Sequence, residues 1–375
     1  MLKIAFCISV IYIVIYALYL GGTSVLAIRR KHENRYLFLF SLALACFGCS
    51  VTPSDAYDLY RHYQYIDIVR QMKPSFIEYM FANHNILGGG SRSSLYGFKL
   101  LIYIISKLES NRWLPFITIL AVYLIWTYIT TDWLTRKKRL DLLLPSLLFC
   151  VSVMPFIYVN TGIRNSLAAS IAGLALYNEF VKKQNPVLTS ISLLVACTFH
   201  SALILVIPCW IIAHFKFNFK VMSVIIIGLL LLDPVAQTLY RVGTDTIQTI
   251  AWSYLAYSSD SAYFYSVGYL VIDIAFLLIV LCVLFPKRNA ICLEESKLYN
   301  FILTYACIIV GQIGHYDLVL RPMYVFAILS GPITYYIFTA LNGKVSKQLI
   351  YIFSFVCFFI ALYIHGRNYL TIRYF

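Results

Sequence analysis

The chain has 375 residues, of which 61% are hydrophobic and only 12% are charged. Apolar runs long enough to cross a bilayer recur from end to end, which excludes an ordinary soluble domain and predicts a polytopic integral membrane protein. The net charge of +14 lies in short basic clusters between these runs, where the positive-inside rule places them, and this argues against nucleic acid as a partner.

A single all-α membrane domain is expected over residues 1–375, because no interval between apolar runs is long enough to build a separate core. The first external loop is expected at 54–112 and the second at 241–263. The ten cysteines lie almost all inside apolar runs. The pair in the segment CFGC has no histidine or acid at ligand spacing, so the sequence predicts no metal and no cofactor.

Basic clusters set the topology, because the spans between neighbouring cytoplasmic clusters must be even in number. The clusters are Arg29 to Arg35, Arg136 to Arg139, Lys182 with Lys183, Lys216 with Lys220, Lys287 with Arg288, and Lys344 with Lys347. Segment 4–27 is then a retained span that runs inward, 36–53 runs outward, and 113–134 returns the chain to the cytoplasmic side. Residues 95–107 are too short to be a further span and are expected to form an amphipathic helix at the outer interface.

The apolar stretch at 187–215 is too short for the two crossings that parity requires after the spans 140–159 and 165–181. It offers only two helices of about 13–14 residues, each about 20 Å long, whereas the hydrocarbon core is about 30 Å thick. A non-helical tip within that depth is tolerated only against protein or a water-filled cavity. We therefore expect a short helical hairpin whose tip, at His200, forms the floor of an outward-facing cleft.

The remaining spans complete the expected topology. They are 221–240, 264–285, 299–319, 322–341 and 348–365. Together with the earlier segments they make about twelve membrane segments, counting the hairpin, with both ends of the chain outside.

Arginine rather than lysine dominates the face that this topology places outside. The arginines are Arg61, Arg70, Arg92, Arg112, Arg164, Arg241, Arg321, Arg367 and Arg373. A planar guanidinium binds phosphate and carboxylate through two parallel hydrogen bonds, so an anionic partner is expected at this face. Arg112, Arg367 and Arg373 are instead expected to reach lipid headgroups.

Arg164, Arg321 and His200 are the residues that could carry chemistry. Arg164 opens an apolar helix, where the dipole does not favour a cation, and no carboxylate lies close to it in sequence, so ligand binding is favoured over headgroup contact. Arg321 follows Asp317 by one helical turn, which leaves a ligand and an intramolecular ion pair equally open. His200 could accept a proton, or it could simply be hydrogen-bonded to a neighbouring helix.

The start of the first external loop combines acids with tyrosines just past a membrane exit. The residues that could bind a sugar are Asp55, Asp58, Tyr60, Arg61 and Tyr63. Aromatic rings at an interface are ordinary belt residues, but carboxylates can also bind sugar hydroxyls while rings cover the apolar faces of pyranoses. The cluster is therefore compatible with a sugar site as well as with an interface belt.

Four segments, in this order along the chain, resemble those of the EpsG/Wzy-like polysaccharide polymerases. They are DLYRHY in the first external loop, GIRNSLAAS at the start of a mid-chain helix, ACTFHSALILVIP soon after it, and LVLRPMY near the end. The similarity in order and topology covers nearly the whole chain. Many relatives carry glutamine after the helix-opening arginine, where this chain has Asn165, so the arginine is kept but its amide neighbour differs.

The resemblance implies a GT-C-like membrane glycosyltransferase in the bacterial cytoplasmic membrane. It would polymerise undecaprenyl-diphosphate-linked oligosaccharide repeat units at the outer face, without a metal, into a capsule, exopolysaccharide or O-antigen. Membrane lipid would surround it, and a chain-length regulator is a candidate partner. Arg164 and Arg321 would bind the diphosphate, and His200 would take or position the acceptor proton. The substrate-binding residues would be Asp55, Asp58, Tyr60, Arg61, Tyr63, Asn165 and Arg241, with Asp58 and Arg61 on the sugar.

Two other function classes remain open. A flippase for lipid-linked oligosaccharide would also need a cationic cavity and many spans. It would normally show two related halves and charges through the midplane of the bilayer, whereas the charges here lie toward the outer face. A membrane O-acyltransferase would favour a histidine and would receive its acyl donor from the cytoplasmic side.

Overall fold

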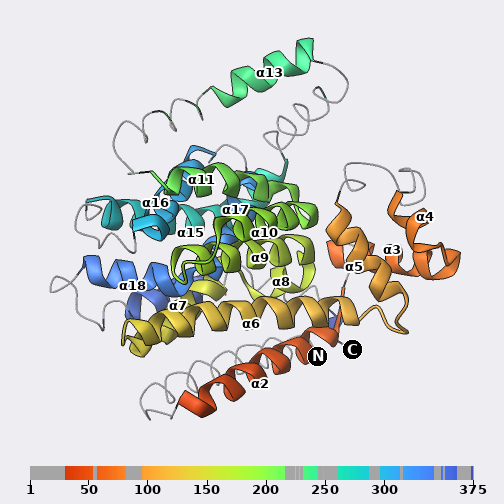
Figure 1. Ribbon diagram of the computed structural model, residues 1–375, viewed down its shortest axis with the longest axis horizontal. Helices are drawn as coiled ribbons and strands as arrows, with labels where there is room; N and C mark the ends of the chain where they lie inside the picture. The colour runs from red at the N-terminus through yellow and green to blue at the C-terminus, as the bar shows by residue number, and fades with distance from the viewer. Residues whose placement is uncertain are drawn as a thin grey trace.

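The computed structural model is almost entirely helical in the parts of the chain that it describes (Figure 1). These parts are residues 30–53, 57–81, 95–215, 231–243, 261–286, 296–312, 316–341, 351–360 and 373–374, with four single positions between them. The strands described are β1 (Val51–Thr52) and β2 (Arg373–Tyr374), which form one short antiparallel pair. The all-α prediction is therefore confirmed for the described residues.

The helices follow one another along the chain with short connections. They are α2 (Arg30–Cys49), α3 (Asp58–Met72), α4 (Phe76–Phe81), α5 (Tyr96–Ser106), α6 (Trp113–Arg136), η3 (Leu140–Leu142), α7 (Leu143–Val153), α8 (Phe156–Thr161), α9 (Ile163–Phe180), α10 (Pro186–Phe199), η4 (Ser201–Leu205), α11 (Val206–Ala213), α13 (Leu232–Val242), α15 (Ser261–Leu284), α16 (Ser296–Gly311), α17 (Tyr316–Ile328), α18 (Ser330–Ala340) and a further helix, Tyr351–Ile360. The bounds of α6, α9 and α15 lie close to the predicted spans 113–134, 165–181 and 264–285. The predicted span 299–319 differs, because α16 ends at Gly311 and α17 begins at Tyr316.

Helix α9 lies among the described helices as their common neighbour, because α6, α10 and α17 all pack against it. Its sequence, IRNSLAASIAGLALYNEF, is rich in small residues, which let neighbouring helices approach closely. At Gly173 a Cβ would lie 2.6 Å from Cγ2 of Ile328 on α17, so the glycine permits this packing. Most of α9 is buried in consequence, from Ile163 at its start to Phe180 at its end.

Two predicted spans are broken rather than continuous. Residues 140–159 form η3, α7 and α8, and the break falls at Pro155, whose ring removes a backbone donor and disfavours a helical conformation at the preceding residue. Residues 322–341 belong to α17 and α18, which meet with a bend of 80°. This second break falls just before Ser330-Gly331-Pro332, where the proline disfavours a helical conformation at the residue before it. Trp126 Nε1 donates to Ser330 Oγ at 2.7 Å and holds the start of α18 against α6.

Residues 187–215 turn back at His200, as the hairpin prediction requires. Helix α10 packs along α9, His200 itself is extended with φ −151° and ψ 120°, and η4 and α11 follow. His200 lies near Arg164 at the start of α9, with which it interacts electrostatically. The end of α11 returns to the opposite end of α9, where His214 Nε2 lies 2.7 Å from Glu179 Oε1. Both short helices therefore run between the same two ends of α9.

Helices α3, α4 and α5 form a separate unit, which lies on the right of Figure 1. We call it the external unit after its predicted location; its core includes Leu59, Ile66 and Ile102, and this core continues into Ile163 and Leu167 of α9. Helix α5 coincides with the amphipathic helix predicted in this loop, and its place at a membrane interface stays a prediction. The external unit thus packs against the start of α9.

Among the described residues, α6 is the helix that is long and apolar enough to cross a membrane by length and composition. The bent pair α17 and α18 would make a second if it is counted as one span, and several shorter apolar helices accompany them. The predicted total of about twelve segments and the GT-C-like arrangement therefore stay predictions. The predicted span 4–27 and most of residues 221–263 lie outside the described residues.

Candidate functional site

Charged residues from the external unit and from α9 meet where α3 begins beside the start of α9. Arg164 Nη2 lies 3.4 Å from Asp58 Oδ2, and the other carboxylate oxygen of Asp58 lies 3.4 Å from Arg61 Nη1. Asp58 and Arg164 are 106 residues apart, so no local sequence pattern could show this partner. Both contacts are long and Asp58 is 39% exposed, so each contributes about 1 kcal/mol or less and a stronger anion could displace the carboxylate.

Arg164 is held by its surroundings although its place on the helix is unfavourable for a cation. It is the second residue of α9, where the helix dipole is positive, and the Asp58 carboxylate offsets that cost. The Phe98 ring centroid lies 5.6 Å from Arg164 Cζ, a distance at which a guanidinium is attracted to the ring face. The His62 ring packs on Phe98 in turn, with centroids 4.7 Å apart. With 15% of its side chain exposed, Arg164 has a defined position that a ligand can still reach.

Helix α5 also packs against the tip of the hairpin. A Cβ on Gly97 would lie 2.4 Å from Thr198 Oγ1 and 2.7 Å from a ring carbon of Phe199, so this close approach depends on glycine. Phe199 packs against the core of the external unit and also against the larger apolar core that the other helices share. The residues next to His200 are therefore held by the same unit that supplies Asp58.

His200 presents one ring nitrogen to the backbone. The Ala202 N–H donates to His200 Nδ1 at 3.2 Å, so Nδ1 carries the lone pair and a neutral ring carries its proton on Nε2. The residue is 6% exposed, and the charges that act on it most strongly are, in order, Arg321, Arg164 and Asp58. His200 is therefore placed to donate a hydrogen bond from Nε2 close to two arginines and a carboxylate.

Asn165 joins α9 to α17 beside Arg321. Its Nδ2 donates to the Arg321 carbonyl oxygen at 3.5 Å, and its buried Oδ1 has no hydrogen-bond partner among the described residues. A buried acceptor without a partner costs roughly 1–3 kcal/mol, so a ligand hydroxyl that donates to this oxygen would be favoured. The side chain of Asp317, the alternative partner predicted for Arg321, lies outside the part of the chain that the structure describes.

The structure brings most of the predicted site residues together. We call the group that meets here the arginine cluster; its members are Asp58, Arg61, Arg164, Asn165, His200 and Arg321. Tyr60 is 38% exposed on α3, and its side chain makes no hydrogen bond or ion pair with the described residues of the arginine cluster. Tyr63 instead faces Cys49 and Arg112, where burial raises the pKa of its hydroxyl.

Two further predicted residues are not part of the arginine cluster. Arg241 is exposed on α13 and makes no hydrogen bond or ion pair with the residues that the structure describes. Figure 1 shows α13 apart from the external unit and from α9. Asp55 lies outside the described residues. The roles predicted for both therefore stay predictions.

Phe98 is a neighbour of the site that was not among the predicted residues, and Asn160 is an unpredicted buried amide one helix before Arg164 in the sequence. The prediction for residues 95–107 assigned the apolar side chains of this helix to the lipid interface, whereas the Phe98 ring faces Arg164. Asn160 is fully buried on α8, and neither polar atom of its amide has a hydrogen-bond partner among the described residues. An amide inside an apolar run, four residues before Arg164, was the available signal for this second residue.

The arginine cluster offers cationic donors for an anion together with one carboxylate. Guanidinium groups stabilise charge that develops on phosphate oxygens, and a carboxylate can accept a proton from a hydroxyl. In the described parts of the chain, no group of three or more His, Cys, Asp or Glu side chains is placed to hold a metal ion. The chemistry that these residues support is a transfer reaction with a phosphate-containing leaving group.

Comparison with known proteins gives a family. The family model described as the EpsG family matches residues 34–375, which is nearly the whole chain and includes every member of the arginine cluster. This match confirms the resemblance seen in the four sequence segments. No curated protein and no solved structure matched the chain.

Proposed function

Because this chain belongs to the EpsG family, the family of Wzy-like polysaccharide polymerases, we propose that it joins undecaprenyl-diphosphate-linked oligosaccharide repeat units into a surface polysaccharide. Family membership makes the chain a membrane protein of polysaccharide biosynthesis. The proposal adds the lipid-linked donor, multiple spans of the bacterial cytoplasmic membrane and a metal-independent reaction at its outer face. The observation that carries it is the meeting of Arg164, Arg321 and His200 with one carboxylate.

Arg164, Arg321 and the Nε2–H of His200 would bind the diphosphate of the donor. Guanidinium groups offer parallel hydrogen bonds to phosphate oxygens, and they stabilise the charge that develops as the diphosphate leaves. The contact of 3.4 Å between Arg164 and Asp58 is weak enough to be exchanged for a diphosphate, which carries more negative charge than a carboxylate. Because a diphosphate is already a good leaving group, these donors would suffice without a metal.

Asp58 would accept the proton of the attacking hydroxyl once the diphosphate has replaced it at Arg164. A hydroxyl oxygen of the acceptor sugar forms a bond to the anomeric carbon of the growing chain. The bond from that carbon to the diphosphate oxygen breaks, and undecaprenyl diphosphate leaves with the electron pair. The hydroxyl proton passes to Asp58. His200 is less suited to this role, because its Nδ1 lone pair already accepts the Ala202 N–H.

Arg61 and Asn165 would hold the sugars on either side of the reacting bond. Arg61 lies 3.4 Å from Asp58 and is half exposed, so it can donate to a sugar hydroxyl near the proton acceptor. Asn165 Oδ1 would accept from a hydroxyl, which satisfies its buried oxygen. Both residues thus extend the site from the diphosphate toward the glycan.

A polymerase explains the distribution of charge better than a flippase does. Arg164 and Glu179 lie near the two ends of α9, about 22 Å apart at ~1.5 Å per residue. The residues of α9 between them are apolar, small or uncharged, and most are buried. A path for a charged headgroup through the bilayer would need polar or charged groups along that interval.

The test is polymerisation by the purified protein. Full-length protein in nanodiscs would be incubated with undecaprenyl-diphosphate-linked repeat units in the presence of EDTA, and the glycans separated on a gel. We expect a ladder of lengthening products. The Arg164→Ala variant should lose about 100-fold or more in rate, because it removes a donor to the leaving group.

The Arg112→Ala variant is the control, since it removes an exposed arginine at the start of α6 instead of the partly buried arginine at the start of α9. It should keep the ladder. Repeat units of the correct structure that stay single with folded wild-type protein would contradict the polymerase proposal. A full ladder from Arg164→Ala at normal folding would contradict the assignment of Arg164 to the diphosphate.

A further inference from the structure

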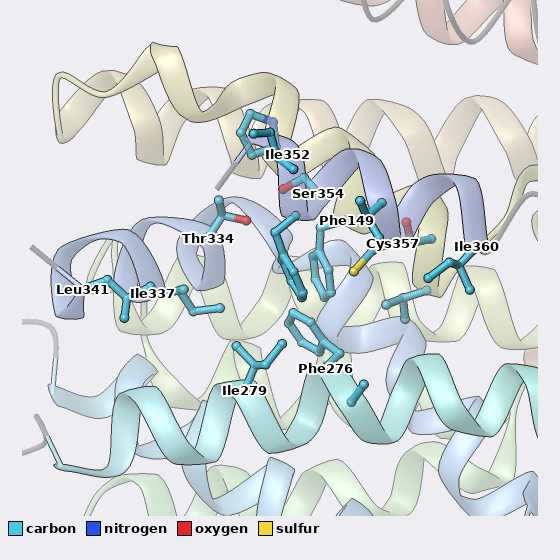
Figure 2. A pocket seen from close by; sticks show the side chains of 16 residues that line it. Phe149, Phe276, Ile279, Thr334, Ile337, Leu341, Ile352, Ser354, Cys357 and Ile360 are labelled. Carbon is cyan, nitrogen blue, oxygen red and sulfur yellow. The ribbon is translucent and has the colours of Figure 1, made fainter. Parts of the chain in front are cut away.

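A groove of about 680 Å³ lies between α7, α15, α18 and the helix Tyr351–Ile360 (Figure 2). Phe149 of α7, Phe276 and Ile279 of α15, Ile337 of α18 and Cys357 of the last helix reach into this space from different sides. Its volume falls within the range of about 300–1,000 Å³ that is typical of sites for small organic ligands. The groove is distinct from the arginine cluster, since none of the cluster's members lines it.

The lining of this groove selects for hydrocarbon. Among the residues that the structure describes, no charged side chain lines it, and the lining side chains with a polar atom are Ser152, Thr334, Ser354 and Cys357. The Ser152 hydroxyl already donates to the Leu148 carbonyl oxygen at 2.6 Å, within its own helix. A sugar, a phosphate or a peptide backbone placed here would lose hydrogen bonds without replacement, whereas a hydrocarbon chain would lose none.

The groove is open along the helix Tyr351–Ile360. Four of its lining residues there are strongly exposed: Ile352 at 56%, Phe353 at 46%, Val356 at 48% and Ile360 at 46%. In a membrane protein such an apolar opening meets lipid hydrocarbon rather than water. A chain that is anchored elsewhere can therefore enter the groove from its side, without passing through the protein interior.

A packed aromatic contact connects the wall of the groove to the helix that carries Arg321. Phe276 stacks on Phe149 with ring centroids 3.8 Å apart, and it also meets Phe326 of α17 edge to face at 6.5 Å. Phe326 follows Arg321 by five residues, or about 7.5 Å along the helix. A long lipid whose diphosphate is bound at Arg321 therefore has an apolar site within reach for part of its tail.

We propose that this groove binds a segment of the isoprenoid chain of the lipid-linked substrate, an inference that rests on the function proposed above. The groove would fix the direction in which the tail leaves the diphosphate. It would thereby orient the reacting anomeric carbon at the arginine cluster.

The test uses a polyprenyl diphosphate that carries a photoactivatable diazirine on its terminal isoprene unit. Purified full-length protein in nanodiscs would be labelled with this probe, and the labelled peptides identified by mass spectrometry. We expect label on peptides from α7, α15 and the helix Tyr351–Ile360. The Ala275→Trp variant, which fills the groove from α15, should reduce that labelling about tenfold, as expected if apolar contact with the tail is lost.

The matched control is Leu278→Trp, because Leu278 is 48% exposed on the same helix and does not line the groove. It should leave the labelling unchanged. Ser354→Trp fills the groove from the opposite wall and should repeat the effect of Ala275→Trp, which separates groove filling from a folding defect in one variant.

Three outcomes would overturn the assignment: label on other helices, labelling unaffected by both groove-filling variants, or equal labelling of the groove by a diazirine phospholipid in competition. The last would show that the groove takes any bilayer chain. A protein that is labelled in the groove but makes no polymer would support the groove and contradict the polymerase proposal. Normal polymerisation without labelling of the groove would support the polymerase proposal and contradict the assignment of the groove.

Discussion

The two ends of α9 are both charged, but they are built differently. At its far end Glu179 accepts from Trp210 Nε1 and contacts His214 Nε2, each at 2.7 Å, and only 3% of its side chain is exposed. At its start Arg164 and Asp58 meet at 3.4 Å, and the carboxylate is 39% exposed. The far end is closed and tightly bonded, whereas the start is open and loosely bonded.

This difference separates a structural contact from a site. At the far end the Tyr177 hydroxyl also donates to Asp132, at 2.6 Å. Together with the contacts of Glu179, this hydrogen bond satisfies polar groups within the protein. At the start the arginine cluster has more cationic than anionic groups and contacts that an anion could replace. Stability should therefore depend on the far end and polymerisation on the start, and each prediction below tests one side of this contrast.

The largest effect is expected for Asp58→Asn at the start of α9. An amide cannot take the hydroxyl proton, so kcat should fall about 1,000-fold, within the range that general bases contribute. The KM for the donor should not rise, because the amide competes less well than the carboxylate for Arg164. Steady-state polymerisation kinetics measure both values, and the free energy of unfolding should change by about 1 kcal/mol or less.

Asp67→Asn is the control for this substitution. Asp67 also pairs with an arginine on α3, since its Oδ1 lies 2.7 Å from Arg70 Nη1, but it does not contact Arg164. Its kcat should stay close to that of the wild type. If Asp58→Asn polymerised as fast as Asp67→Asn, the start of α9 would lack the proton acceptor assigned to it.

The next effect is expected at the far end of α9, and it should concern stability. Glu179→Leu removes the acceptor of the half-buried Trp210 Nε1–H and the partner of the His214 ring, whose side chain is 27% exposed, at a cost of about 2 kcal/mol in the free energy of unfolding. Polymerisation per folded molecule should stay within about twofold, because this end lies about 22 Å from the arginine cluster. Unfolding in mixed detergent micelles and activity at matched folded protein measure the two quantities.

Glu179→Gln should recover part of the loss, since its amide oxygen can still accept from Trp210. A Glu179→Leu protein of normal stability but without activity would contradict the structural role assigned to the far end of α9.

The turns and helix breaks around α9 could be predicted from the sequence to different extents. The turn at His200 followed from helix length and from the basic residues on either side, because the rise per residue is fixed. The break at Pro155 was also visible in the sequence, although the predicted span ran through it. The bend between α17 and α18 was visible in the same way, because Ser330, Gly331 and Pro332 stand where it falls, although the predicted span ran through them as well. The contact of Trp126 with Ser330 was not visible, since it joins two helices that are far apart in the sequence.

Individual site residues could be recognised in the sequence by their type, but the contacts between them could not be predicted. Arg164 and His200 were recognisable because an ionisable group inside an apolar run is costly. The Asp58 carboxylate could not be assigned to Arg164, because the contact spans 106 residues and requires the external unit to pack on α9. The proton position on His200 was also beyond the sequence, since it depends on the backbone direction at Ala202.

The smallest effect is expected for His200→Gln, and it tests how the start of α9 works. If His200 donates from Nε2, a glutamine amide can place an N–H in nearly the same position, so kcat should fall only about tenfold. If His200 were the base, glutamine could not take the proton and kcat should fall about 100-fold to 10,000-fold. His200→Ala removes the donor altogether and should cost about 100-fold on the first view.

The pH profile of kcat adds a second readout, because a donor that keeps its proton does not titrate during the reaction. The profile should keep its shape in His200→Gln and change in Asp58→Asn, where the proton acceptor is lost. A glutamine variant as inactive as the alanine variant, with an altered pH profile, would instead make His200 the base. Asp58 would then be left as the group that holds Arg164 until the donor arrives.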